Sequence, residues 1–406
     1  MDYTTLIPES KEGQEQPTKG MQTLYEVCQQ VVDGRGARGK RSELAGLLVV
    51  LVLAKLAGMQ SLLGASDWIQ DQEHLLRQGL QLTWKRMPCA NTYSYALARL
   101  DSQQVNVALA AWLVRKEAES QCGAEPSRLV AHPSERHVQL AIDGKALRGT
   151  GKQAYGGEGP QKQVLHVYEV QTGIVLQQCP IALEHNEVST LKPLLTEVLC
   201  KGRILTSDAA QSYHEFGRLV KRSGGEVIVF VKNNTPVTRA DLELFFEDSE
   251  ADRRTWQAWD HVEKGHGRLE RRSILTTPDL NDYLRRDWGE VGQVFRVERE
   301  RTSRDKHSVE VVYGWTSLSQ KRCSPERLAQ LIRTHWAVEN RLHWRRDVTL
   351  GKDRCGVRFP LVAQMLAVLN TVVLSLMDRH QVPNVARQLR RFASHPDEAL
   401  AWILDF

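Results

Sequence analysis

The stretch His137-Val-Gln-Leu-Ala-Ile-Asp143 marks the point where the chain changes from a helical to a strand-like pattern. Apolar and polar residues alternate in it, which is the period of a β-strand. Further strand-like runs stand at 164–170, 173–183, 202–208 and 226–232, and helical patterns at 188–200 and 209–223. This order of three strands, helix, strand, helix and strand predicts an α/β core with a mixed sheet.

Upstream of this stretch, residues 21–123 show helical periodicity and predict a helical N-terminal domain. Its most apolar run, Leu44 to Ala54, is shorter than the roughly 20 residues that a membrane span needs, and Lys55 interrupts it. We therefore expect a buried helix and no membrane partner. Residues 124–136 contain two prolines and predict a linker, and residues 1–20 form a polar tail without the apolar core of a signal peptide.

Downstream, the strand-like runs continue in a different arrangement. The runs at 268–275, 293–300 and 309–317 predict a β-rich insertion over residues 235–322, after a first core part at 137–234. Helical periodicity returns at Ser324, with helices expected at 326–348 and 359–378. Residues 323–406 are therefore expected to complete the core.

The composition is that of an ordinary globular protein. The chain has 406 residues, of which 41% are hydrophobic and 25% charged, so a wholly disordered chain is excluded. The seven cysteines are scattered and form no Cys-x-x-Cys pair, which argues against a disulfide framework and a structural zinc site. We expect a cytoplasmic protein.

Three acidic residues stand out by position. Asp143 and Asp208 end predicted strands, and Glu339 lies in the middle of a predicted helix. Acids at the ends of neighbouring strands can converge, and their mutual repulsion then calls for a cation. Carboxylates and water suit Mg²⁺ or Mn²⁺. The pattern alone leaves open that each acid is an ordinary strand-end or helix-surface residue.

The helix face around Glu339 carries His335, Trp336, His343 and Arg346, because residues three or four apart share a face. These groups can donate to phosphate or stack on bases. One alternative is an amphipathic core helix with a salt-bridged Glu. Another is a zinc site, although the order His-x₃-Glu-x₃-His is not the His-Glu-x-x-His of zinc proteases.

Positive charge is concentrated around this helix. Residues 321–358 contain ten Lys or Arg and four acids, a balance of 10 − 4 = +6, whereas the whole chain has 54 − 49 = +5. A basic strip beside a carboxylate cluster is typical of an enzyme that cuts phosphodiesters. A solvated helix face is the simpler alternative.

Six short motifs occur in order along the chain. They are Ala141-Ile-Asp-Gly-Lys-Ala-Leu-Arg-Gly149, Thr206-Ser-Asp-Ala209, Val231-Lys-Asn-Asn234, His266-Gly-Arg-Leu-Glu-Arg271, His335-Trp-Ala-Val-Glu-Asn-Arg-Leu-His-Trp344 and Arg346-Asp-Val-Thr-Leu-Gly-Lys-Asp353. Together they resemble the DDE transposases of the ISAs-type insertion sequences, which include the H-repeat-associated proteins. The resemblance covers nearly the whole chain, and the N-terminal region looks like that family's associated domain.

The resemblance implies a ribonuclease H-like core with a β insertion before the last catalytic helix. By motif, it implies that Asp143, Asp208 and Glu339 are the catalytic, metal-binding acids. The implied cofactor is Mg²⁺ or Mn²⁺, with two ions expected. The implied reaction is cleavage at the terminal inverted repeats of an insertion sequence and strand transfer into target DNA. We expect double-stranded DNA as partner, a homodimer on DNA, and a bacterial cytoplasmic protein that associates with the nucleoid.

Basic and polar residues near the motifs are candidates for DNA contact. In and around the core they are Lys145, Arg148, Lys232, Asn233, His266, Arg268, Arg271, His335, Asn340, His343 and Arg346. In the N-terminal domain, which we expect to bind DNA, candidates for backbone contact are Arg35, Arg38, Lys40 and Arg41. For each of them a structural salt bridge, a cap or a solvated loop is the alternative.

The chain also departs from the family pattern. Ala210-Gln-Ser-Tyr-His214 replaces a His-Thr-Gln-like run, Val231-Lys-Asn-Asn-Thr-Pro236 replaces Lys-Gly-Asn-Gln-Pro, and Lys352 stands where Glu is usual. None of these changes touches the three acids. They leave two alternatives to an active transposase: a catalytically silent or repurposed DNA-binding protein of transposase descent, and a ribonuclease H-like nuclease without strand transfer.

Overall fold

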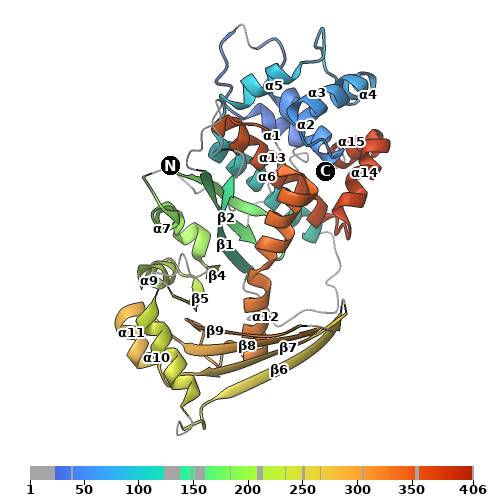
Figure 1. The fold of residues 1–406 in the computed structure, drawn as a ribbon. Helices are drawn as coiled ribbons and strands as arrows, with labels where there is room; N and C mark the ends of the chain where they lie inside the picture. Colours follow the sequence, from blue (N-terminus) through green and yellow to red (C-terminus); the bar gives the residue numbers. More distant parts are fainter. Residues whose placement is uncertain are drawn as a thin grey trace. The chain divides into compact units, whose positions relative to one another are not determined.

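The computed structural model divides the chain into two compact units (Figure 1). It describes residues 23–37, 40–122, 138–147, 150, 161–182, 184–207, 214–233, 235–248, 252–265, 267–303, 306–352 and 356–404. The first unit consists of residues 1–130, 144–184 and 338–406, and the second of residues 131–143 and 185–337. The predicted tail at 1–20 and linker at 124–136 lie outside the described residues.

The N-terminal region is helical, as predicted. Its helices are α1 (Leu24–Gln29), α2 (Leu44–Leu56), α3 (Leu62–Asp71), α4 (Glu73–Leu80), α5 (Ala90–Leu97) and α6 (Ser102–Cys122). Every residue of α2 is buried, as expected for a helix that is apolar on all sides. Helix α3 begins at Leu62, where the Ser61 hydroxyl accepts a hydrogen bond from the backbone N–H of Gly64 and so caps the helix.

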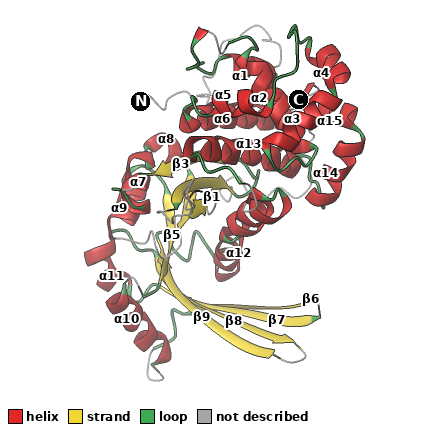
Figure 2. Cartoon of the chain, turned by 45° about the horizontal axis from the view of Figure 1, so that its top comes forward, coloured by secondary structure: helices red, strands yellow, loops and turns green. Residues whose placement is uncertain are grey.

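The C-terminal helices of the first unit pack on these N-terminal helices. They are α13 (Pro360–Arg379), α14 (Val385–Ser394) and α15 (Pro396–Leu404), and α13 contacts α2, α5 and α6 (Figure 2). Among the described residues, α13 is long and apolar enough to cross a membrane, but 83% of its most apolar window is buried inside the protein. It therefore serves as a core helix.

Three strands belong wholly or partly to the first unit, in the order β3-β2-β1. They are β1 (Val138–Leu147), β2 (Lys162–Glu169) and β3 (Val175–Ile181). The hairpin between β2 and β3 turns at Gly173, whose φ of +76° favours glycine. The end of β1 packs against β2 and α13 through Leu147, Val164 and Ala367.

The sheet of the second unit has the order β1-β4-β5-β9-β8-β7-β6. Its further strands are β4 (Arg203–Ser207), β5 (Glu226–Val231), β6 (Gln257–Gly265), β7 (Arg268–Thr277), β8 (Gln293–Ser303) and β9 (Lys306–Thr316). The pairs β1·β4 and β4·β5 are parallel, and the pairs from β5·β9 outward to β6·β7 are antiparallel. The predicted mixed sheet is therefore confirmed, and the arrangement is consistent with a ribonuclease H-like core.

The helices of the second unit differ in detail from the predicted ones. They are α7 (Glu187–Leu191), α8 (Glu197–Cys200), α9 (His214–Arg222), α10 (Pro236–Glu247), α11 (Asn281–Trp288) and α12 (Pro325–His335). The single helix predicted at 188–200 was wrong: a 3₁₀ turn at Lys192–Leu194 separates α7 from α8, because Pro193 cannot donate a helical hydrogen bond. The insertion carries α10 and α11 besides its strands.

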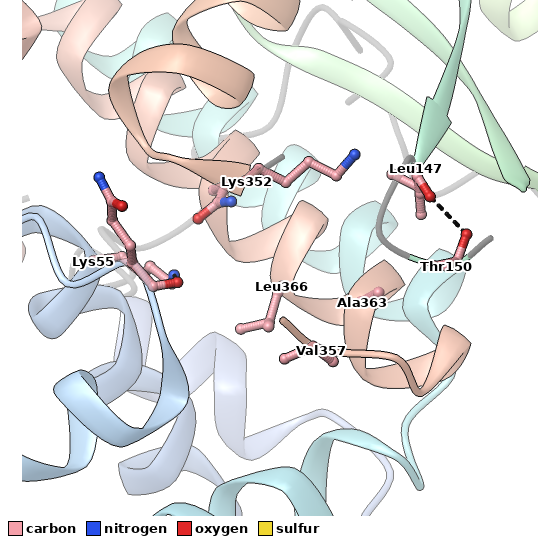
Figure 3. Close-up of a pocket in the computed structure, with 9 residues that line it drawn as sticks. Lys55, Leu147, Thr150, Lys352, Val357, Ala363 and Leu366 are labelled. Carbon is pink, nitrogen blue, oxygen red and sulfur yellow. Dashed lines mark hydrogen bonds between the residues drawn. The ribbon is translucent and has the colours of Figure 1, made fainter. Parts of the chain in front are cut away.

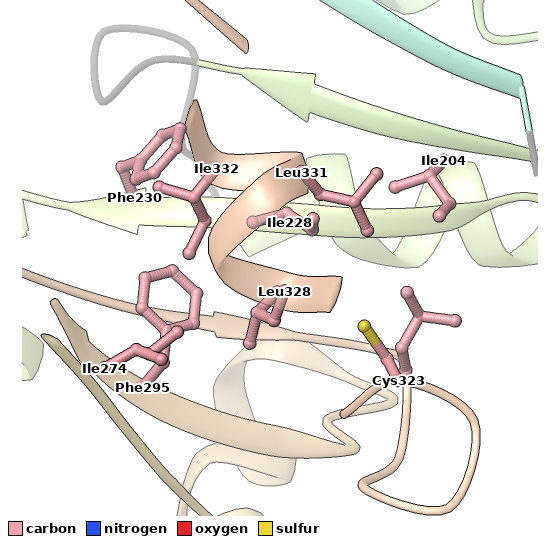
Figure 4. Close-up of a cluster of buried hydrophobic side chains, with 10 residues drawn as sticks. Ile204, Ile228, Phe230, Ile274, Phe295, Cys323, Leu328, Leu331 and Ile332 are labelled. Atoms are coloured by element: carbon pink, nitrogen blue, oxygen red, sulfur yellow. The ribbon is translucent and has the colours of Figure 1, made fainter. Parts of the chain in front are cut away.

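Helix α12 lies against the sheet of the second unit and closes a hydrophobic core (Figure 4). Leu328, Leu331 and Ile332 of the helix meet Ile228, Phe230, Ile274 and Phe295 of the strands. The apolar side of α12 therefore fixes the register of the helix that precedes Glu339.

The long helix predicted at 326–348 does not continue unbroken. Helix α12 ends at His335, and two π-helical segments follow, Val338–His343 and Arg345–Thr349. A π-helical turn is rare and occurs frequently at functional sites. Glu339 lies in the first of these segments, so its backbone differs from the regular α-helix that its periodicity predicted.

Candidate active site

In the first unit, the Glu339 carboxylate is held by two neighbours. Its Oε2 lies 2.9 Å from Nδ1 of His343, and its Oε1 lies 3.5 Å from Nζ of Lys145. The hydrogen bond with His343 and the positive charge of Lys145 outweigh partial burial and lower the pKa of Glu339 to about 2. The side chain of Glu339 is 46% exposed. It is therefore an ionised carboxylate that a ligand can reach.

Lys145 bridges this carboxylate to a second acid. Its Nζ lies 3.2 Å from Oδ2 of Asp347, which follows the first π-helical segment. Asp143 stands two residues before Lys145 on β1, so the two side chains point to the same face of that strand. The strand thus carries a carboxyl group and an ammonium group along one face.

Behind Glu339, buried polar side chains form a chain of contacts. His343 Nε2 lies 3.3 Å from Nδ1 of His166 on β2, and His166 Nε2 lies 3.0 Å from Nη1 of Arg346. His166, His343 and Arg346 are each 0% exposed. Burial, followed by the nearby Arg346 charge, lowers the pKa of His166 well below 6.5. His166 is therefore neutral at physiological pH.

In the second unit, the register of β1 against β4 places Ile142 opposite Ser207. Asp143 follows Ile142 in the chain, and Asp208 follows Ser207. Asp208 itself lies outside the described residues, as do the candidates Arg38, Arg148 and His266. The two strands are parallel, so both of these acids follow the same edge of the paired segment.

His335 ends α12 as a buried, neutral side chain of the second unit. Its Nδ1 lies 3.0 Å from Oγ1 of Thr206 on β4. Burial lowers the pKa of His335 to about 4, a nearby Asp143 charge opposes this, and Lys232 adds to it. Gln139 ties the same helix end to β1 by donating to the carbonyl of Leu331 at 2.8 Å. His335 therefore anchors the helix to the sheet.

The other predicted contact residues fall into an exposed and a buried group. Lys232, Asn233, Arg268, Arg271, Asn340, Lys40 and Arg41 are exposed. Lys232 Nζ lies 5.7 Å from the ring centre of the exposed Trp336, and Arg271 forms an ion pair with Asp260 at 2.9 Å. Arg35 is 4% exposed and pairs with Asp33 at 2.8 Å. Because Arg35, His335, His343 and Arg346 are buried, we assign them positioning roles.

Sequence reasoning did not single out His166, Thr206, Gln139 or Asp347. His166 is the one histidine inside the mostly apolar run Val164 to Val170, and a buried histidine in a strand is the only signal that could have found it. Thr206 and Gln139 look like ordinary strand residues. Their roles depend on partners more than 60 residues away in the chain.

A small pocket of the first unit lies near the end of β1 (Figure 3). Leu147, Thr150, Val357, Ala363 and Leu366 line it together with Lys55, Gln60, Lys352 and Asn370. Thr150 Oγ1 donates to the carbonyl of Leu147 at 2.6 Å, and Lys352 Nζ donates to the carbonyl of Ala146 at 3.4 Å. Lys352 thus holds the strand that carries Lys145.

Comparison with known proteins gives matches over most of the chain. Residues 134–376 match the transposase DDE domain, and residues 25–113 match the DDE_Tnp_1-associated domain. The Escherichia coli K12 putative protein YbfL is 22% identical over 92% of this chain and 95% of its own length. The H repeat-associated putative transposase YhhI of the same strain is 25% identical over 64% of this chain and 70% of its own length. The putative transposase YncI of Escherichia coli O157:H7 is 22% identical over 88% of this chain and 87% of its own length.

Proposed function

This chain belongs to the DDE transposase family, and we propose that it binds the terminal inverted repeats of an insertion sequence, cleaves the DNA there and transfers the freed strand into target DNA. The enzyme class, a metal-dependent transposase, follows from family membership. Binding of the repeats, cleavage and strand transfer are the proposal. The observation that carries it is Glu339, an ionised and half-exposed carboxylate that buried side chains hold in place.

We propose Asp143, Asp208 and Glu339 as the catalytic acids. The register of β1 and β4 supports the pair of aspartates, because each directly follows one of two paired residues, Ile142 and Ser207. Lys145 supports the inclusion of Glu339, because it contacts that carboxylate from two residues after Asp143. The assignment matches the family's motif at each position.

The donor set suits a hard divalent cation. Carboxylate oxygens are the ligands that Mg²⁺ and Mn²⁺ prefer. Glu339 is deprotonated without help from a metal, since its pKa is lowered to about 2. We propose two bound ions, which when present supply positive charge that activates the attacking hydroxyl and stabilises the leaving oxygen.

The remaining candidate residues are proposed to contact DNA or to balance the charge of Glu339. Lys232, Arg268 and Arg271 are exposed cations of the second unit that can bind backbone phosphates. Asn233 and Asn340 are exposed and can donate to phosphate oxygens, as can Lys40 and Arg41 in the N-terminal helical region. Lys145 neutralises part of the charge of Glu339 until metal and DNA arrive.

The setting of the reaction is also a proposal. Two ends of one element must be joined in a single event, so we propose that the protein acts as a homodimer on double-stranded DNA. We place it in the bacterial cytoplasm, associated with the nucleoid while it is bound to DNA.

One incubation tests this function. The purified protein is mixed with a labelled duplex that ends in the terminal sequence of its own element, an unlabelled target plasmid and Mg²⁺. We expect cleaved strands with free 3′-hydroxyls and labelled plasmid as the joined product. Binding without cleavage would overturn the proposal in favour of a silent DNA-binding protein, and cleavage without joined plasmid would reduce it to a nuclease.

A further inference from the structure

The buried hydrogen bonds behind Glu339 all donate in the same direction, and Arg346 at their far end determines that direction. Arg346 Nη1 lies 3.0 Å from His166 Nε2. A guanidinium has only donors and no lone pair to accept with. Nε2 of His166 must therefore accept this hydrogen bond. A neutral imidazole then carries its proton on the other nitrogen, Nδ1.

That proton determines the next link. His166 Nδ1 lies 3.3 Å from His343 Nε2, and two N–H groups cannot face each other in one hydrogen bond. His343 Nε2 is therefore the acceptor, and the proton of His343 is on Nδ1. Nδ1 in turn lies 2.9 Å from Oε2 of Glu339 and donates to it. Donation thus runs in one direction, from Arg346 through His166 and His343 to the carboxylate.

The surroundings of His166 keep its ring in this orientation. Gln178 lies directly opposite His166 in the β2·β3 register and hydrogen-bonds to it. Gln178 Oε1 also accepts from Thr371 Oγ1 of α13 at 3.1 Å. The rings of His166 and His343 meet edge to face, with centroids 5.0 Å apart. All of these residues except Glu339 are buried, so water cannot replace a link.

We propose that His166 is a positioning residue for Glu339: its Nδ1–H donates to Nε2 of His343 and so holds the His343 ring with its own Nδ1–H, which the ionised carboxylate requires, directed at Oε2. His343 then occupies Oε2, so that Oε1, which faces Lys145, is the oxygen presented to a cation. The part of the inference that concerns cation binding rests on the proposed function. Hydrogen bonds behind a metal ligand typically change metal affinity by about 10- to 100-fold when removed.

Two matched variants distinguish the roles of the two ring nitrogens of His166. His166→Asn keeps an amide donor near the position of Nδ1, toward His343. His166→Gln places its amide near the position of Nε2, toward Arg346, and loses the donor to His343. Nitrogen NMR of ¹⁵N-histidine-labelled, metal-free full-length protein reports which ring nitrogen of His343 carries the proton, and calorimetry reports Mn²⁺ affinity.

We expect the Nδ1–H form of both histidines in the wild type and of His343 in His166→Asn. In His166→Gln the ionised Glu339 still keeps the proton of His343 on Nδ1, but Nε2 of His343 loses its hydrogen-bond donor, so we expect the Nε2 resonance of His343 to shift and Mn²⁺ affinity to fall by about tenfold. An Nε2–H form of His343 in the wild type would overturn the proposal even if no variant folds. An unchanged Nε2 resonance of His343 together with unchanged Mn²⁺ affinity in folded His166→Gln would also overturn it. The NMR readout needs neither metal nor DNA, so it can succeed while the proposed DNA chemistry fails.

Discussion

The Nδ1 atom of His343 lies 2.9 Å from Oε2 of Glu339, four residues earlier in the chain, and both residues belong to one π-helical segment. His343 is buried and Glu339 is half-exposed. A rigid interior side chain thus holds a carboxylate at the surface. If Glu339 binds a metal as proposed, this arrangement holds the ligand in place before the metal arrives.

If Glu339 binds a cation as proposed, the ammonium group of Lys145 competes with that cation for the carboxylate. Its Nζ lies 3.5 Å from Oε1, and a partly exposed charge pair is worth about 1 kcal/mol at most. Replacement by Lys145→Met removes this competing charge, so we expect Mn²⁺ to bind about fivefold more tightly to the DNA-free protein. Titration calorimetry measures this change. Lys201→Met, which removes an exposed lysine paired with Glu197, should leave the affinity unchanged. Weaker Mn²⁺ binding in Lys145→Met would show that the lysine supports the site instead.

The buried His335 makes stability depend on pH. Its pKa is about 4 in the folded protein, mainly because of burial, and 6.5 when unfolded. Below pH 6.5 the histidine of the unfolded chain takes up a proton while that of the folded chain does not. The free energy of unfolding is therefore highest above pH 6.5, as far as this group is concerned, and falls progressively down to about pH 4. The difference corresponds to about 3 kcal/mol.

Urea unfolding at pH 7 and at pH 4 measures this loss. His335→Gln does not titrate in this range, so we expect its stability to fall less between the two pH values than that of the wild type. His307→Gln removes an exposed histidine and should follow the wild type. Equal losses in the wild type and in His335→Gln would contradict the assignment of a neutral, buried His335.

If exposed cations of the second unit contact DNA, their replacement should change the salt dependence of DNA binding. If Lys232 contacts a phosphate, Lys232→Gln should weaken DNA binding and flatten the plot of log affinity against log salt concentration by about one unit. Arg271→Gln should behave in the same way, whereas Lys201→Gln, which removes an exposed lysine outside the proposed contacts, should keep the wild-type slope. Binding isotherms at four or more salt concentrations test this. An unchanged slope would remove the tested residue from the DNA interface.

A glycine of β9 tests the packing of the sheet. A Cβ at Gly314 would collide with the carbonyl of Val229 on β5 and the ring of Phe295 on β8. Gly314→Ala should therefore lower the free energy of unfolding by about 1–3 kcal/mol, the usual range for overpacking. At Gly265, near the end of β6, an added Cβ meets nothing within 4 Å, so Gly265→Ala should be nearly neutral. Equal stability of the two variants in urea unfolding would contradict the described pairing.

Local patterns were sufficient to predict the central strands of the sheet. The strand before Asp143 alternates, and the strands before Asp208 and Lys232 are short apolar runs with clear ends, so β1, β4 and β5 could be placed. The same reasoning places Glu339 on a helical face with His343, because residues four apart share a face in a helix.

The rest depends on contacts between distant parts of the chain. The period of residues 326–348 gives no sign that α12 ends at His335 and that two π-helical segments follow. His166 reads as a lone polar residue in an apolar strand, and its partner His343 lies 177 residues away. The sequence also does not show that His335, His343 and Arg346 are buried while other cations of the same basic stretch are exposed.

Glu339 is the residue on which the proposed function depends most directly, and one comparison tests it. Glu339→Gln keeps the shape of the side chain but removes the charge that a divalent cation needs. With a labelled element-end duplex and Mg²⁺, we expect this variant to bind DNA as the wild type does and to lose at least about 100-fold in cleavage rate. Glu247→Gln, an exposed carboxylate on α10, should cut normally. Cleavage by folded Glu339→Gln at the wild-type rate would contradict the central claim.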